Sequence, residues 1–439
     1  SLVGSEMCIR DRYADGAVPG MTIEPELPDD LLKEAREYTD TAIITICRFS
    51  GEGWDRKCEA AQDGYVLDGD EKRNSDLSAK IFEDGDFCLT NAENAMVEKV
   101  KKAFPHVIVV MNVGGIVDTK WFKDCEEIQS VLMAWQGGME GGLATADILC
   151  GDVNPSGKLS DTYAKDLEDY PSTANFHESA FYVDYTEDIY VGYRYFETFA
   201  KDKVLYPFGF GLSYTTFAVT AEAKEKDVDQ VTVTATVENT GKTAGKEVVQ
   251  VYVKAPQGVL GKPARALVGF AKTGILAPGA KETVTINVAK ESFASYDDSG
   301  ATGHKSCYVL EEGSYEFYVG SDVRSAAFAG AYEQPFKVVE TLTEAMAPVE
   351  AFERMKAVAG EDGTLKPGYE AAPLRTVDPA KRMKENRMEP IPYTGDKGYK
   401  LGDVLDKKVT MEEFVAQLSD DDLLSLIHIS EPTRLDVIS

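Results

Sequence analysis

The stretch NAENAMVEKVKKAFPHVIVVM, residues 91–111, decides the fold class because it joins a helical pattern directly to a buried strand. Asn91 begins a helix whose apolar positions recur on one face, and Pro105 ends it. Residues 107–111 then form a continuous apolar run, which is typical of a strand covered on both faces of a parallel sheet.

The same alternation continues on both sides of this stretch. Upstream, Pro28 and Asp29 begin a helix, and residues 42–47 (AIITIC) form a second apolar strand. Downstream, the pattern predicts a short helix around Trp121, a strand over residues 130–135 and a helix over residues 140–149. We therefore predict an α/β fold with an open, mainly parallel sheet over about residues 24–165, inside a domain of residues 13–216. Loops beyond the carboxyl ends of such strands carry function; they are expected at residues 48–56, 112–115 and 136–142.

From residue 217 the apolar residues recur with a period of two. Residues 231–237 (VTVTATV), 247–253 (EVVQVYV) and 282–288 (ETVTINV) alternate, and residues 315–319 (YEFYV) form a further strand. Short alternating strands separated by Asn-Thr-Gly and Ala-Pro-Gly turns predict an all-β sandwich over residues 217–338.

The remaining segments carry weaker signals. Residues 339–408 are rich in charge and proline, and we predict a linker that wraps over other surfaces. Residues 409–423 look like a helical start to a further domain, with Thr410 as N-cap. Residues 2–11 and 424–434 back-translate to nearly reverse-complementary strings, so we interpret residues 1–12 and 424–439 as adapter-derived and leave them out of the fold.

Composition excludes several functional classes. The chain has 75 acidic and 46 basic residues, a net charge of −29, which argues against nucleic acid as a partner. No apolar run reaches the roughly 18 residues that a membrane span needs. The seven cysteines are scattered through apolar patterns, which favours free thiols and a cytoplasmic location. The four histidines lack metal-ligand spacing, so no metal and no cofactor are expected.

Chemistry centres on SGEGWDR, residues 50–56. Glycoside cleavage needs one carboxylic acid to protonate the leaving oxygen and a second carboxylate across the bond. Glu52 lies between two glycines that allow close approach to a sugar, and Trp54 can stack on a sugar ring. Asp55 and Arg56 can pair to support the loop, while Arg48 either supports Asp55 or contacts substrate at the cleft edge. Taken alone, a glutamate on a solvated loop is the simpler interpretation.

The order of further motifs resembles glycoside hydrolase family 3. The motifs are ICRFSGEGWDRK (46–57), GDFCLT (85–90), VIVVMNVGG (107–115), AWQGGMEGG (134–142), GDVNPSGKLSDTY (151–163), EDIYVGYRYFETF (187–199) and YPFGFGLSYTTF (206–217). Residues 237–253 (VENTGKTAGKEVVQVYV) resemble the fibronectin type III-like domain of that family. The resemblance covers about residues 23–330.

This resemblance implies a retaining β-glucosidase-type hydrolase of terminal non-reducing β-D-glycosides, with Glu52 as general acid/base and no cofactor. It places the catalytic aspartate in a (β/α)8 barrel, usually in a Ser-Asp-Trp motif, which this sequence lacks. Residues 409–423 resemble the start of that barrel, so a permuted chain cut before the barrel is expected, inactive on its own. The expected partners are a β-linked glycoside and the missing barrel.

Other interpretations stay open at this point. A β-xylosidase or arabinosidase of the same family, or a non-catalytic carbohydrate-binding module, would share these domains. A serine α/β-hydrolase is disfavoured because Gly-x-Ser-x-Gly does not occur. The glycines in residues 137–142 are predicted to allow tight strand-to-helix packing, Trp121 and Trp135 to lie in the core, and Asp188 and Arg194 to brace the domain junction.

Overall fold

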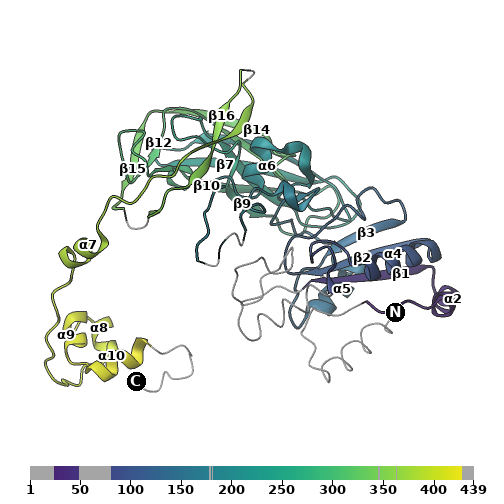
Figure 1. Cartoon of the computed structure of the whole chain (residues 1–439), viewed down its shortest axis with the longest axis horizontal. Coiled ribbons are helices and arrows are strands. Elements are labelled where there is room, and N and C mark those ends of the chain that lie inside the picture. Colours follow the sequence, from purple (N-terminus) through teal and green to yellow (C-terminus); the bar gives the residue numbers. More distant parts are fainter. Residues whose placement is uncertain are drawn as a thin grey trace. The chain divides into compact units, whose positions relative to one another are not determined.

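The computed structural model describes residues 24–48, 81–176, 179, 181–344, 347–361 and 363–427 (Figure 1). Residues 1–375 and residues 376–439 form two compact units. The first unit contains the predicted parallel sheet and the predicted β-sandwich.

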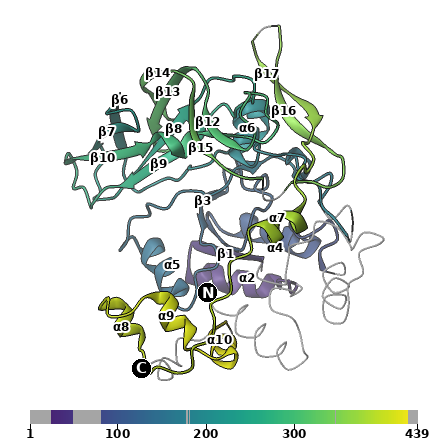
Figure 2. The ribbon, with the colours of Figure 1, turned by 90° about the vertical axis from the view of Figure 1, so that its left-hand side faces the viewer.

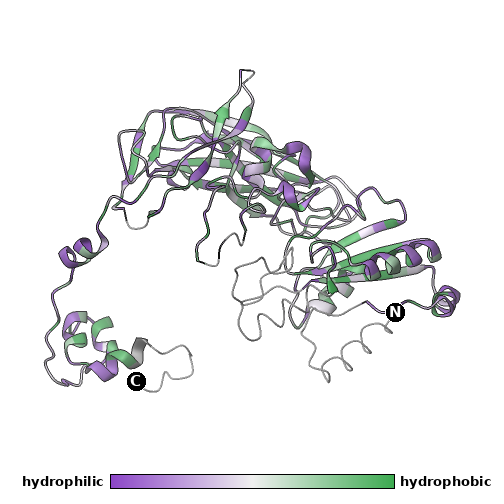
Figure 3. Ribbon diagram, viewed as in Figure 1, coloured by the Kyte–Doolittle hydropathy of each residue, from purple (hydrophilic) through white to green (hydrophobic). Residues whose placement is uncertain are grey.

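A three-stranded parallel sheet forms the first layer, with strand order β1-β2-β3. The strands are β1 (Thr41–Arg48), β2 (His106–Val113) and β3 (Ile128–Met133), and the helices are α2 (Asp29–Tyr38), α4 (Asn91–Ala103) and α5 (Gly141–Cys150). In Figure 1 helix α4 runs along the sheet, and Figure 3 shows the strands mainly green against a mainly purple α2. Val107, Val109 and Val113 are fully buried because β2 is the central strand. This confirms the predicted parallel α/β layer.

Two details of this layer differ from the prediction. Around Trp121 there is only a turn: the Lys123 N–H donates to the Thr119 carbonyl, and Asp124 then takes a φ of 60°, which ends any helix. Strand β3 begins and ends two residues earlier than expected, because Trp135 has a φ of 54° and cannot continue an extended strand. Both tryptophans still pack against the core of the sheet, as predicted.

A β-sandwich follows, as predicted. One antiparallel sheet has the order β10-β7-β6 and the other β14-β13-β8-β9. Their bounds are β6 (Phe217–Glu225), β7 (Gln230–Asn239), β8 (Val248–Lys254), β9 (Ala266–Lys272), β10 (Lys281–Ala289), β13 (Gly313–Gly320) and β14 (Ala327–Gln334). Alternate residues of β7 and β8 point into one core, where Val233, Val251 and Phe317 are buried. A third sheet, β11-β12-β15, is made of β11 (Ser295–Asp297), β12 (Cys307–Leu310) and β15 (Lys337–Thr341).

Short elements connect the two layers. They are β4 (Tyr163–Ala164), which pairs with β5 (Val204–Tyr206), the 3-10 turns η1 (Leu167–Asp169) and η2 (Lys201–Lys203), and helix α6 (Tyr193–Phe199). A third 3-10 turn, η3 (Lys290–Phe293), follows β10 within the sandwich. The Leu267 N–H of β9 donates to the Tyr193 hydroxyl of α6 at 2.8 Å. Gln250 of β8 donates to the Gly209 carbonyl. These bonds tie the segment after the first sheet to the sandwich.

The segment predicted as a linker, residues 339–408, contains regular structure. Strands β16 (Glu353–Ala359) and β17 (Leu365–Ala371) form an antiparallel hairpin, and β17 lies against α6 (Figure 2). Charged contacts help to hold the hairpin, because Arg354 binds both oxygens of Asp298 and also Glu370.

The second unit is helical by itself. It contains α7 (Pro379–Glu385), α8 (Leu401–Leu405), α9 (Met411–Ala416) and α10 (Asp420–Ile427). Thr410 caps α9 as predicted, and Glu413 completes a capping box. Across the described parts of both units, no helix is long and apolar enough to cross a membrane.

Candidate active site

The predicted acid/base loop lies outside the described residues. Glu52, Trp54, Asp55 and Arg56 all belong to residues 49–80, which the structure does not describe. Arg48, the last residue of β1, is described, and it marks the carboxyl end of the strand from which the loop leaves.

Arg48 is buried, with 3% of the residue exposed, although it carries a charge. Its Nε donates to the Asp86 carbonyl and its Nη2 to the Cys88 carbonyl, both at 2.8 Å. Nη1 donates to the carbonyl of Cys47, and the two Nη atoms bind the two carboxylate oxygens of Glu93 at 2.8 and 2.7 Å. A guanidinium has five N–H donors, and all five are used. All five N–H groups thus have partners among the described residues, and a contact of Arg48 with substrate stays a prediction.

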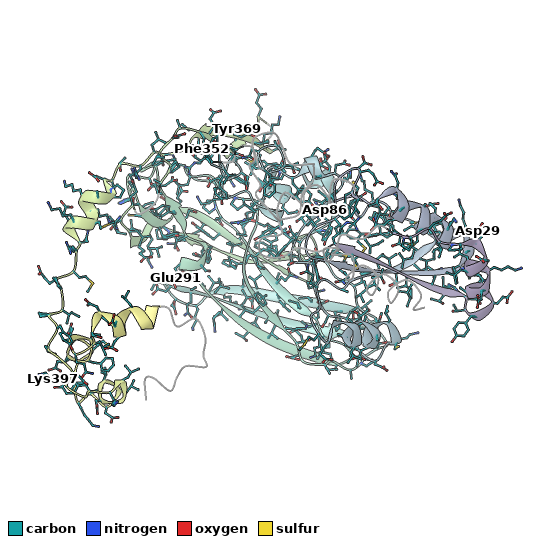
Figure 4. The ribbon with its side chains drawn as sticks, turned by 60° about the horizontal axis from the view of Figure 1, so that its bottom comes forward. Asp29, Asp86, Glu291, Phe352, Tyr369 and Lys397 are labelled. Carbon is teal, nitrogen blue, oxygen red and sulfur yellow. The ribbon has the colours of Figure 1, made fainter. Side chains whose placement is uncertain are left out.

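Glu93 is fixed from a second direction by helix α4. Its backbone N–H donates to the Thr90 hydroxyl at 3.1 Å, and its Oε2 accepts from the Thr90 N–H at 2.8 Å. This reciprocal capping box satisfies two N–H groups at the start of α4. Glu93 consequently joins the end of β1 to the start of α4. Asp86, labelled in Figure 4, lies in the segment between β1 and α4 and supplies the carbonyl for Arg48 Nε.

Other polar groups lie near the same edge of the sheet. The Asn112 amide of β2 contacts Cys47 Sγ at 3.7 Å. Burial raises the pKa of Asp118, although the Lys120 N–H and the Lys120 charge oppose that rise. The Lys120 ammonium in turn forms an ion pair with Asp166 at 2.5 Å. None of the described residues forms a group of three or more His, Cys, Asp or Glu side chains that could hold a metal ion.

Two protein-family domains match this chain. The glycosyl hydrolase family 3 C-terminal domain matches residues 26–214, and the fibronectin type III-like domain matches residues 247–323. The chain belongs to glycosyl hydrolase family 3.

Relatives of this family 3 chain are named as β-glucosidases. Beta-glucosidase A of Butyrivibrio fibrisolvens is 47% identical over 95% of this chain and 54% of its own length. Beta-glucosidase of Ruminococcus albus is 46% identical over 94% of this chain and 40% of its own length. The crystal structure of a β-glucosidase from Paenibacillus barengoltzii has a TM-score of 0.83 and 43% identity over 95% of this chain and 45% of that chain. The family 3 chain thus spans about half the length of the relatives it matches.

The glycines after β3 follow the prediction only in part. A Cβ on Gly137 would come within 2.7 Å of the Gly141 Cα, so tight packing between the strand end and α5 requires glycine there. Gly138 has a φ of 66°, and a Cβ at Gly138, Gly141 or Gly142 would meet no atom within 4 Å. Close packing against the described residues therefore does not explain why glycine stands at these three positions.

Asp188 contacts the hairpin of β16 and β17. Its carboxylate lies 3.7 Å from Arg354 Nη1 of the hairpin, and burial raises its pKa while the Arg354 charge opposes the rise. Backbone contacts strengthen the link, because the Met355 N–H donates to the Thr186 carbonyl and the Ala357 N–H to the Tyr190 hydroxyl. The hairpin therefore fastens the segment before α6 in this family 3 chain.

Sequence reasoning missed Glu93 as a site residue. Thr90-x-x-Glu93 is a capping-box pattern that can be seen in the sequence. The bond to Arg48 crosses 45 residues, however, and no local pattern indicates it.

Proposed function

We propose that this chain supplies the acid/base half of a retaining β-glucosidase. One observation carries the proposal: the family 3 match over residues 26–214 contains SGEGWDR directly after the carboxyl end of β1. Functional loops of parallel sheets leave from such strand ends. The relatives named as β-glucosidases support glucose as the glycone.

The proposed chemistry assigns two steps to Glu52. As an acid, it protonates the oxygen of the leaving group while a carboxylate on the far side of the sugar attacks the anomeric carbon. As a base, it then removes a proton from the water that hydrolyses the glycosyl-enzyme. Trp54 would cover the leaving-group side, and Asp55 and Arg56 would support the loop.

The attacking carboxylate is proposed to come from the barrel domain of the family. Ser-Asp-Trp, its usual motif, does not occur in this sequence, and the chain spans about half of its relatives. A retaining site needs its two carboxyl groups about 5–5.5 Å apart, so barrel and α/β layer must meet at the loop. The proposed domains are residues 13–216, 217–338, 339–408 as connecting segment with its hairpin, and 409–423 as the barrel start.

The partners proposed for the protein are a β-linked glucoside and that barrel. A cytoplasmic location is also proposed, supported by seven scattered cysteines, of which the five described are free thiols. Reducing compartments keep thiols in this state.

Turnover of 4-nitrophenyl β-glucoside tests the proposal. The chain as given is expected to show none, and the full-length enzyme with the barrel is expected to be active. In the full-length enzyme Glu52→Gln should remove most of the activity on cellobiose, whereas Asp55→Asn should keep more of it. Turnover by the chain alone that disappears on a point mutation within it would contradict the two-domain site.

A further inference from the structure

The small sheet β11-β12-β15, whose strands β12 and β15 are labelled in Figures 1 and 2, carries a row of three exposed side chains. Tyr296 of β11 lies opposite Tyr308 of β12, which lies opposite Glu340 of β15. Directly opposed residues of antiparallel strands point to the same face of a sheet. The tyrosines are 39% and 38% exposed, and their ring centroids are 5.2 Å apart at an interplanar angle of 50°. The row therefore has two neighbouring rings at one end and an exposed carboxylate at the other.

The rest of the sheet holds this row in place. Val309 of β12 is buried in the core of the sandwich. The loop from β11 to β12 is fixed by the buried Asp297, whose carboxylate accepts from the backbone N–H groups of residues 300–302. The Leu342 N–H, just past β15, donates to the Ser306 carbonyl at 2.8 Å. A ligand would therefore meet a preformed surface, which lowers the entropy lost on binding.

The polar ends of the row are unpartnered within the described structure. Neither the Tyr296 hydroxyl nor the Tyr308 hydroxyl forms a hydrogen bond there, and the Glu340 carboxylate forms neither a hydrogen bond nor an ion pair. All three groups are exposed enough to reach a ligand. The row thus combines aromatic surface with two hydroxyl groups and one acceptor that are available for hydrogen bonds.

A second aromatic pair on the same sandwich shows how different this is. Phe328 and Tyr318 are cross-strand neighbours with ring centroids 5.9 Å apart, and Phe328 is 59% exposed. There the Tyr318 hydroxyl donates to Glu316 at 2.6 Å, and Glu316 also binds Lys254 at 2.9 Å. The Arg265 guanidinium lies over the Tyr318 ring, 4.2 Å from its centroid. The polar groups of this second pair are already used inside the protein.

The chemistry of the first row fits a neutral sugar chain. The C–H faces of a pyranose pack on aromatic rings, and its hydroxyls donate to a carboxylate and exchange hydrogen bonds with phenols. Three adjacent strands span about 10 Å, the length of about two linked pyranose rings. The angle between the two rings suits a twisted single chain better than a flat crystalline surface.

Other ligand classes fit less well. Glu340 and the net charge of −29 disfavour an anion. A stable protein interface buries about 800 Å² on each partner, and two tyrosines that are less than half exposed provide only a small part of that area.

We propose that Tyr296, Tyr308 and Glu340 form a binding site for a β-linked glucan chain on the β-sandwich. The two rings support successive sugar units, and the Glu340 carboxylate accepts hydrogen bonds from their hydroxyls. The choice of a β-linked chain rests on the proposed function, but the binding itself needs no catalysis. The site would keep the protein close to a polymer that carries the glucosidic bonds.

Affinity electrophoresis of the chain in native gels tests the proposal. The net charge of −29 carries the chain through the gel, and soluble mixed-linkage β-glucan in the gel should retard it, whereas dextran, which is α-linked, should not. Tyr308→Ala should weaken the affinity for β-glucan on the order of 10-fold. Tyr308→Phe keeps the ring and should lose less.

Two further variants complete the design. Glu340→Ala removes an exposed carboxylate without touching the rings, and it should weaken binding on the order of 10-fold. It tests the site even if the alanine variant of a tyrosine fails to fold. Phe328→Ala is the matched control, because it removes an exposed ring of the other aromatic pair of the sandwich, and it should leave the retardation unchanged.

The inference is overturned if β-glucan does not retard the chain, if dextran retards it equally, or if Tyr308→Ala and Glu340→Ala bind no more weakly than Phe328→Ala. If Trp54→Ala abolishes the retardation and Tyr308→Ala does not, the sugar is bound at the proposed acid/base loop and the site on the sandwich fails. The proposed function is not affected by that result. Conversely, a loss of acid/base behaviour at Glu52 in the full-length enzyme would leave binding by the sandwich intact, so the two proposals fail separately.

Discussion

Asn239, the last residue of β7, makes four side-chain hydrogen bonds at the turn that follows the strand, and its removal tests the packing there. The side chain is fully buried. Its Oδ1 accepts from the Thr215 hydroxyl at 2.7 Å and from the Gly241 N–H at 3.1 Å. Its Nδ2 donates to the carbonyls of Leu276 and Thr243, both at 2.8 Å.

The cost of Asn239→Ala can be worked from these four bonds. The bonds to Thr215 and Leu276 are fully buried, so water cannot replace the amide there. A buried polar group left without its partner costs about 1–3 kcal/mol. The bonds to Gly241 and Thr243 are partly exposed, and water can restore part of them. We therefore expect the free energy of unfolding of the sandwich to fall by about 2–4 kcal/mol.

Native-state hydrogen exchange measures this loss locally. Peptides from β7 and β8 report on the sandwich, and the three tryptophans, Trp54, Trp121 and Trp135, report only on residues before it. Asn287→Ala is the control, because Asn287 makes one exposed bond, to the Thr232 hydroxyl, in the same sandwich. It should change stability by less than about 0.5 kcal/mol. If Asn239→Ala costs no more than Asn287→Ala, the turn is not held by this amide and the reasoning is wrong.

Three further predictions concern other parts of the fold. Gly209→Ala should cost about 2–4 kcal/mol in urea unfolding, because φ is 81° and the new Cβ would lie 2.2 Å from Gln250 Oε1; Gly157→Ala, with no atom within 4 Å, should cost less than about 0.5 kcal/mol. Tyr193→Phe should cost about 1 kcal/mol in the same assay by removing the 2.8 Å bond from the Leu267 N–H, and an unchanged urea midpoint would show that this bond does not hold α6 to β9. Burial opposes ionisation of Asp297, but hydrogen bonds from Thr302, Gly300 and Ser299 outweigh it and lower its pKa. Its contribution to stability is therefore present above the unfolded pKa of about 3.9 and lost as the pH falls through the lower folded pKa. Asp297→Asn should flatten the loss of stability between about pH 4 and pH 2, and an identical acid profile would count against this role.

The regular elements with strong apolar periodicity could be predicted from the sequence. The apolar run of residues 107–111 lies inside β2, and the alternating run of residues 231–237 lies inside β7. The continuous apolar run in β2 matches a strand that is buried on both faces of its sheet. The alternating run in β7 matches a strand that is buried on one face. Local pattern and tertiary packing agree there.

The hairpin of β16 and β17 could not be predicted in this way. Its strands are half polar, and Pro367 and Gly368 lie inside β17, where they weaken a strand signal. Arg354 holds the hairpin through Asp298, which is 56 residues away in the chain. The bidentate pair of Arg48 and Glu93 is hidden for the same reason, because sequence shows a cap at Glu93 but not the guanidinium that reaches it.

Chemical rescue of Glu52→Ala in the full-length enzyme tests the central claim most directly. Without its acid/base, the enzyme should still form the glycosyl-enzyme from 2,4-dinitrophenyl β-glucoside, but water should attack slowly because no base activates it. Azide needs no base, so added azide should restore turnover and yield β-glucosyl azide. If azide gives no rescue for Glu52→Ala but rescues Asp55→Ala, Glu52 is not the general acid/base.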